Sequence, residues 1–174
     1  ILPTHRLIFN YDQFTAAEIL EAAAEFFAVE EVESREALEK QMADCVGQVG
    51  CIGLACSKGY FLLRLTDQGV MERLAPGRVQ AWRELDVSIL HVLLLEHLMQ
   101  IDPQKIDDLE NINYLREPDM GYDEVKDKDT SFLYILNATL IEQVKECTQV
   151  GEKMPQKSTD FYPKIITGFV MLPI

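Results

Sequence analysis

The chain has 174 residues, with 16 Lys and Arg against 29 Asp and Glu, a formal net charge of -13 and a hydrophobic content of 48%. This length and composition are typical of one globular domain, here residues 1–174. The excess of acid argues against a nucleic-acid partner, which needs clustered Lys and Arg, and against an anionic membrane as partner. The longest apolar run also falls short of the roughly 20 residues that cross a bilayer.

Helix and strand signals alternate from the first residues onward. Residues 7–9 form an apolar run that predicts a strand. A capping box at residues 15–18 then begins a predicted helix whose apolar positions continue through Phe27. A second helix is predicted to begin after Ser34, a good N-cap residue, and to end near Gly47.

The middle of the chain predicts a β-hairpin near 51–65, because two apolar runs flank a short turn that contains glycine. Asp86 is a candidate N-cap for a strongly apolar helix over residues 87–100. Asp102 followed by proline predicts one more helix start, and residues 112–115 predict a strand.

The last third predicts a short polar helix over 122–128, a buried strand over 132–136 and a final strand over 165–172. Between these strands Thr139 begins a second capping box, and Gly151 is the natural stop of the helix that follows. We therefore expect an α/β or α+β fold, in which amphipathic helices flank a mixed β-sheet.

Cysteine and histidine spacings predict no metal site. The four cysteines form no C-x-x-C pair and no zinc pattern, so we expect reduced thiols and a cytoplasmic protein. His91 and His97 are six residues apart on a predicted helix, which places their rings on different faces.

The stretch 151–164 is the most distinctive part of the chain. Lys157, Ser158 and Thr159 combine one cation with two hydroxyls, and Lys164 adds a second cation. Such a set suits a phosphate, and two prolines stiffen the segment. The alternative is a surface loop whose lysines only offset nearby acid.

His5 and Arg6 are a second pair of candidates for phosphate binding, since both side chains can donate hydrogen bonds to an anion. The alternative is that His5 caps a strand and Arg6 pairs with a surface carboxylate.

The segments 2–6, 154–159, 161–164 and Gly168 resemble the bacterial and archaeal domain-of-unknown-function family numbered 1015, whose members share a Met-Pro-x-Lys-Ser-Thr and Phe-Tyr-Pro-Lys signature. The resemblance implies that this chain is the C-terminal half of a longer protein. Its own N-terminal half, a ParB/sulfiredoxin-like domain, would then be a partner that supplies a catalytic His and Arg.

The resemblance also implies a function. The ParB-like relatives include nucleotidases and kinases, so we expect part of a phosphate- or nucleotide-binding enzyme of phosphoryl transfer. ATP or ADP with magnesium would be the cofactor, and a small phosphorylated molecule the ligand. The alternative is a non-catalytic regulatory or dimerisation domain, a homodimer that uses the apolar helix over residues 87–99 as its interface.

Overall fold

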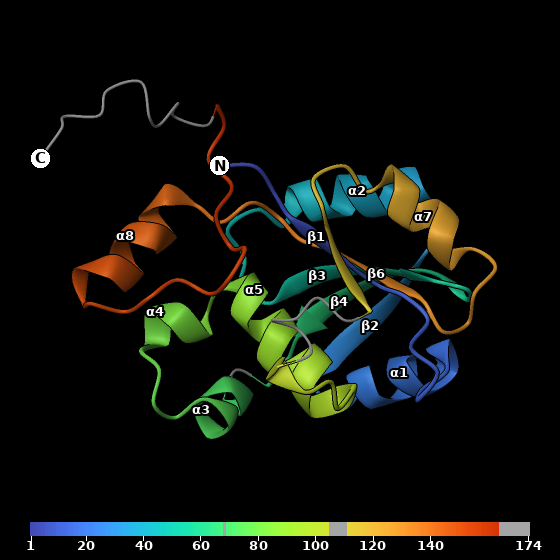
Figure 1. Ribbon diagram of the computed structural model, residues 1–174, viewed down its shortest axis with the longest axis horizontal. Helices are drawn as coiled ribbons and strands as arrows, with labels where there is room; N and C mark the ends of the chain where they lie inside the picture. The colour runs from blue at the N-terminus through green and yellow to red at the C-terminus, as the bar shows by residue number, and fades with distance from the viewer. Residues whose placement is uncertain (68, 105–110, 164–174) are drawn as a thin grey trace, which may run out of the picture.

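A six-stranded sheet forms the centre of the computed structural model, and helices cover both of its faces (Figure 1). The structure describes residues 1–67, 69–104 and 111–163. The strands lie in the order β2-β4-β3-β6-β1-β5. They are β1 (His5–Ile8), β2 (Phe27–Val32), β3 (Cys51–Cys56), β4 (Gly59–Leu65), β5 (Ile112–Leu115) and β6 (Phe132–Ile135).

Every pairing between these strands is antiparallel, so α+β, one of the two predicted classes, is confirmed. The parallel pairing that a mixed sheet requires does not occur among the described strands. The helices are α1 (Ala16–Ala23), α2 (Arg35–Asp44), α3 (Val70–Leu74), α4 (Gln80–Arg83), α5 (Asp86–Ile89), the π-helical η1 (Leu90–Leu98), α7 (Asp119–Val125) and α8 (Ile141–Gln149).

The sheet separates two hydrophobic clusters. Helices α2 and α7 pack on one face, whereas α1, α5 and η1 pack on the other, and α3, α4 and α8 gather at one end of the molecule (Figure 1). Because successive side chains of a strand point to opposite faces, Leu7 joins the cluster under α2 and Ile8 the cluster over η1. The same alternation sends His5 and Arg6 to opposite faces.

The predicted starts of the first two helices are confirmed. Thr15 Oγ1 accepts a hydrogen bond from the Glu18 backbone N–H at 3.3 Å, and the Glu18 carboxylate accepts one from the Thr15 N–H at 2.7 Å. Ser34 Oγ accepts from the Ala37 N–H at 3.2 Å. Each cap accepts a hydrogen bond from a backbone N–H group that the first turn of a helix leaves unpaired. Because the two partners are only three residues apart, such a cap can be predicted from the local sequence.

The first helix is shorter than predicted. It ends at Ala23, and Phe27 begins β2, a strand that the sequence did not indicate. Strand β2 lies at the edge of the sheet and pairs only with β4 among the described strands. Its exposed Glu30 and Glu31 suit an edge strand, where charge discourages pairing with a further strand. The same two residues interrupt the alternation of apolar and polar residues, so the hydrophobic pattern does not predict this strand.

The hairpin and the later strands are where the sequence placed them. Strands β3 and β4 form the predicted hairpin, and β5 and β6 match the apolar runs at 112–115 and 132–136. Helix α7 begins at Asp119, three residues before the predicted start at Tyr122. The Tyr122 side chain, expected on a polar helix, is buried against the sheet.

The predicted helix over residues 87–100 is found as two parts, the short α-helix α5 and the π-helix η1. The N-cap of α5 is Leu85, and Asp86 lies in its first turn. The Asp86 carboxylate accepts a hydrogen bond from the Gly50 N–H at 2.8 Å instead of capping the helix, so that prediction is wrong. The apolar side chains of η1 are buried within this chain, among them Leu90, Leu93, Leu94 and Leu95.

The start of α8 also differs from the prediction. Leu140 is the N-cap, and its N–H donates to Gln143 Oε1 at 2.8 Å. The Thr139 hydroxyl donates to the Ser158 carbonyl at 2.9 Å, so it serves a distant loop and not the helix. Gly151 has φ of 77° just after the helix, which confirms the predicted stop.

Asp102 Oδ1 accepts from the Gln104 N–H at 2.8 Å, as a helix start requires. The rest of that helix, and the strand predicted over 165–172, lie outside the described residues. The four cysteines, which are all described, are buried free thiols, as predicted. Of the helices in the described ranges, none has the length and apolar character to cross a membrane.

Candidate functional site

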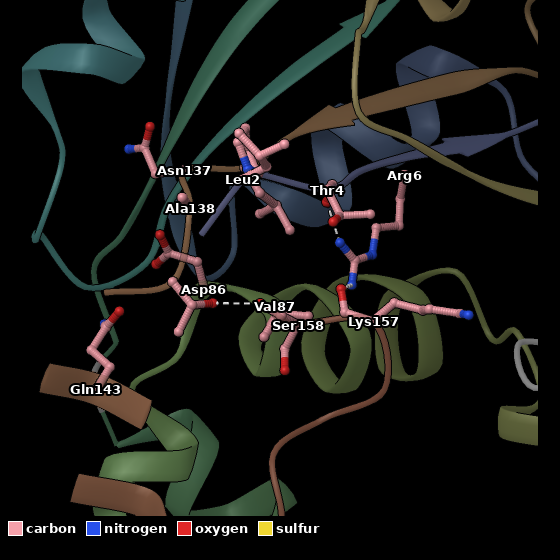
Figure 2. Close-up of a pocket in the computed structure, with 13 residues that line it drawn as sticks. Leu2, Thr4, Arg6, Asp86, Val87, Asn137, Ala138, Gln143, Lys157 and Ser158 are labelled. Carbon is pink, nitrogen blue, oxygen red and sulfur yellow. Dashed lines mark hydrogen bonds between the residues drawn. The ribbon is translucent and has the colours of Figure 1, made fainter. Parts of the chain in front are cut away.

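A small polar hollow lies where the start of the chain, the segment after β6 and the C-terminal loop meet (Figure 2). The residues that line it include Thr4, Arg6, Asp86, Asn137, Gln143, Lys157 and Ser158. Its volume is about 20 Å³, which is room for about one water-sized group.

Strand β1 places Arg6 at this hollow. Because Arg6 points to the face that carries α5 and η1, its guanidinium meets the C-terminal loop and His91. Arg6 donates to the Lys157 carbonyl at 3.0 Å, to His91 Nε2 at 3.3 Å and to the Thr4 carbonyl. The guanidinium also lies 4.9 Å from the centre of the Tyr114 ring.

The Arg6 charge is buried without a counter-charge in the described part of the chain. Its side chain is only 1% exposed, and none of the ion pairs among the described residues includes it. Burial lowers the pKa of Arg6 to about 10, so the group is still protonated at neutral pH. A buried cation that has only neutral partners is costly, and an anion would stabilise it.

His91 is neutral in this arrangement. Burial, and then the nearby Arg6 charge, lower the pKa of His91 to about 3. Because Arg6 Nε–H donates to His91 Nε2, the proton of the neutral imidazole belongs on Nδ1. His91 therefore accepts from Arg6 on one side and can donate on the other.

The C-terminal loop is held against the start of the chain by backbone contacts. The Leu2 N–H donates to the Asp160 carbonyl at 2.8 Å, and Ser158 Oγ donates to the Pro155 carbonyl at 2.7 Å. Lys157 has φ of 54°, a left-handed conformation that turns its carbonyl toward Arg6. These contacts make the Lys157 and Ser158 backbone a wall of the hollow.

The structure brings three of the six predicted phosphate-binding residues together. Arg6, Lys157 and Ser158 line the hollow, whereas Thr159 does not, and Lys164 lies outside the described residues. The Lys157 side chain is exposed, and Figure 2 shows it pointing away from Asp86 and Gln143. The Ser158 hydroxyl is already used as a donor within its own loop.

His5 lies on the opposite face of β1. Its Nδ1 accepts from the Leu136 N–H at 3.2 Å, and its ring lines a different hollow, beside Arg35 and Glu39. Burial, and secondarily the Arg6 charge, lower the pKa of His5 to about 4. His5 and Arg6 therefore do not share one anion site.

Asp86 also lines the hollow, although the sequence predicts it only as the N-cap of a helix. Its carboxylate takes hydrogen bonds from the backbone of Gly50 and Cys51, yet burial outweighs them and raises the pKa of Asp86 to about 7. In Figure 2 Asp86 lies apart from the Arg6 guanidinium, so the two do not pair. Asp86 fixes the start of α5, and with it one side of the hollow.

The histidines do not form a metal site. The His91 ring accepts from Arg6, and the His97 ring packs edge-on against Phe26 with centroids 5.8 Å apart. Across residues 1–67, 69–104 and 111–163, no three His, Cys, Asp or Glu side chains are grouped as a metal ion would need.

Comparison of the chain with models of protein families, with curated proteins and with solved structures found no match. The resemblance to the family numbered 1015 therefore stays a prediction from the sequence.

Proposed function

We propose that this domain binds the phosphate group of a small molecule at the hollow beside Arg6, as part of a phosphate-binding or phosphoryl-transfer protein. The observation that carries the proposal is the buried Arg6 guanidinium, which has no carboxylate partner among the described residues. A phosphate oxygen would supply the missing negative charge and accept charge-assisted hydrogen bonds. The exposed Lys157 can swing over the mouth of the hollow at little cost, because its side chain is not packed.

The size of the hollow limits what it can hold. At about 20 Å³ it has room for one terminal oxygen of a phosphate, and none for a base or a ribose. The hollow therefore takes one oxygen of a phosphate group, and the rest of the ligand, including any base or ribose of ATP or ADP, would lie outside it. A nucleotide would have to bind with only its terminal phosphate at the hollow.

The alternative function, a regulatory or dimerising domain, loses the interface first expected for it. Most apolar side chains of η1 are buried inside this chain, among them Leu90, Leu93, Leu94 and Leu95, so they are not offered to a second copy. A homodimer through another surface stays a prediction.

Binding of inorganic phosphate, ADP and ATP, the nucleotides with and without magnesium, tests the proposal by calorimetry. The informative variant is Lys157→Ala combined with Lys164→Ala, which removes two cations and leaves the hydrogen bonds of Arg6 in place. We expect it to weaken phosphate binding about tenfold, the usual effect of losing a charge-assisted hydrogen bond.

The matched control is Lys58→Ala combined with Lys126→Ala, which removes the same charge at two exposed positions that do not line the hollow. It should leave phosphate affinity unchanged at physiological ionic strength. If both double variants bind phosphate equally well, or the wild-type chain binds none of these ligands, the phosphate proposal is wrong.

A further inference from the structure

A larger groove is lined by the part of the C-terminal loop that precedes Lys157. Its volume is about 650 Å³, within the range of small-molecule sites. One wall comes from α3, α4 and their connection, the other from residues 152–156, and α5 and η1 contribute Ser88 and His91. The groove and the hollow share no lining residue.

Ser88 is the first sign that the groove takes a ligand. The residue is completely buried, and its hydroxyl has no hydrogen-bond partner among the described residues. A buried hydroxyl without a partner costs about 1–3 kcal/mol, so most are satisfied. The residue lines the groove, so a rotation of its side chain would bring the hydroxyl to an acceptor atom of a ligand there.

His91 is the second sign. It lies one helical turn after Ser88 and also lines the groove. Its Nε2 accepts from Arg6, so Nδ1–H is left as a donor. Because the cation behind the ring withdraws electron density, that N–H is a stronger donor than in an isolated imidazole. Neither donor has a hydrogen-bond acceptor among the described residues, so the two together suit a pair of oxygens.

The charge of the groove decides which oxygens fit. Its basic side chains, Arg78 and Lys153, are balanced by Glu96 and Glu152, and Arg78 already pairs with Glu152 at 2.8 Å. A phosphate dianion would find no net positive charge here. A carboxylate has only one negative charge for the groove to compensate, and its two oxygens match the two donors.

The walls indicate the rest of the ligand. Trp82, Val92 and Met154 contribute apolar surface, and the Arg78 guanidinium lies 4.7 Å from the centre of the Trp82 ring. This flat, partly apolar wall suits a ring or branched hydrocarbon body. We infer that the groove is a second binding site, for a small organic carboxylate with an apolar body, whose oxygens accept from Ser88 Oγ–H and His91 Nδ1–H.

Titration of the chain with benzoate, followed by calorimetry and by the NMR signal of the His91 side chain, tests the inference. Benzyl alcohol serves as the uncharged comparison ligand. We expect saturable benzoate binding, weaker binding of benzyl alcohol, and about tenfold weaker benzoate binding to Ser88→Ala. We also expect Ser88→Ala to be at least as stable as wild type, because it removes an unsatisfied buried hydroxyl.

Ser131→Ala is the matched control. Ser131 is equally buried, but its hydroxyl accepts from the Asn10 N–H at 3.4 Å and it does not line the groove. This variant should lose stability and keep full benzoate affinity, the opposite of Ser88→Ala. Benzoate that does not saturate up to its solubility limit, or that binds Ser88→Ala as well as wild type, would overturn the inference.

Phosphate titrations on the same samples separate this site from the proposed function. The Lys157→Ala, Lys164→Ala double variant should lose phosphate affinity and keep benzoate affinity. Failure of either titration therefore leaves the result of the other intact.

Discussion

His5 and Arg6 are neighbours in strand β1 and are both buried, on opposite faces of the sheet, but His5 is neutral and Arg6 is charged. On the α2 face, His5 lies near the carboxylate of Glu39 and yet is neutral, because burial disfavours its charged form. On the η1 face, Arg6 keeps its charge although its described partners are two carbonyls, an imidazole and an aromatic ring. Arginine has too high a pKa to lose its proton, so burial leaves an unmatched charge where histidine would have none. This unmatched charge is the basis of the proposed anion site on the Arg6 face.

The largest expected effect comes from Arg6→Lys. Lysine keeps the charge but cannot reach the Lys157 carbonyl, the Thr4 carbonyl and His91 together, because its donors share one nitrogen. We expect the free energy of unfolding in urea to fall by about 3 kcal/mol.

Arg73→Lys is the control for this change. Arg73 is 61% exposed and pairs with Asp67 at the surface, so the replacement should alter stability by less than about 0.5 kcal/mol. If the two variants lose the same free energy of unfolding, Arg6 needs its guanidinium no more than the exposed Arg73 does.

The second prediction concerns acid stability and tests both faces together. His5 and His91 have folded pKa values of about 4 and 3, against 6.5 when exposed, so only the unfolded chain takes up these protons below pH 6.5. Their contribution to the free energy of unfolding therefore decreases as pH falls from 6.5 toward 4. In a variant with His5→Gln and His91→Gln, the loss between pH 7 and pH 5.5 should be smaller by about 2.5 kcal/mol.

Glutamine can accept the same hydrogen bonds from Leu136 and Arg6, so the double variant should fold. Urea denaturation at several pH values measures the difference, with the exposed His97→Gln as control. The same pH dependence in the double variant and in wild type would show that the two imidazoles are not buried as described.

The smallest effect is expected from Asp86→Asn. The Asp86 pKa is raised from 3.8 to about 7, so between these pH values the folded state holds a proton that the unfolded state lacks. This carboxyl therefore destabilises the fold increasingly as pH rises from 4 to 7. Asparagine keeps an acceptor for the Gly50 N–H without the charge, so it should stabilise the chain by about 1.5 kcal/mol at pH 5.

At pH 4 the same replacement should stabilise the chain by only about 0.5 kcal/mol, since Asp86 is then only partly ionised in the unfolded chain. Thermal unfolding at the two pH values measures the change. A loss of stability at pH 5 would contradict this account and would mean that the Asp86 charge has a stabilising partner.

Features with a local cause could be predicted from the sequence. Thr15 and Ser34 cap helices through bonds to residues three positions away, and the hairpin over 51–65 follows from two apolar runs and one glycine. Thr139 and Asp86 have the same local signature but use their side chains elsewhere. Nothing local distinguishes a cap from a distant contact.

The candidate site was only partly predictable for the same reason. The segment around Lys157 and the residue Arg6 were both singled out, but the contact between them spans 151 positions. The sequence indicated side chains as the phosphate ligands, whereas the loop presents the Lys157 carbonyl to Arg6 and uses the Ser158 hydroxyl internally. The sequence offers His91 only as a candidate metal ligand, because its hydrogen-bond partner, Arg6, is 85 positions away.

The contact between Leu2 and Asp160 joins the start of the chain to a loop that is synthesised after the whole central sheet. The last strand of the central sheet, β6, ends at Ile135, so a nascent chain carries every described strand once Ile135 has been added. The wall that closes the Arg6 hollow is translated more than twenty residues later, with Lys157 and Ser158. The scaffold can therefore form while the guanidinium still faces the solvent, and the hollow closes only when the loop arrives.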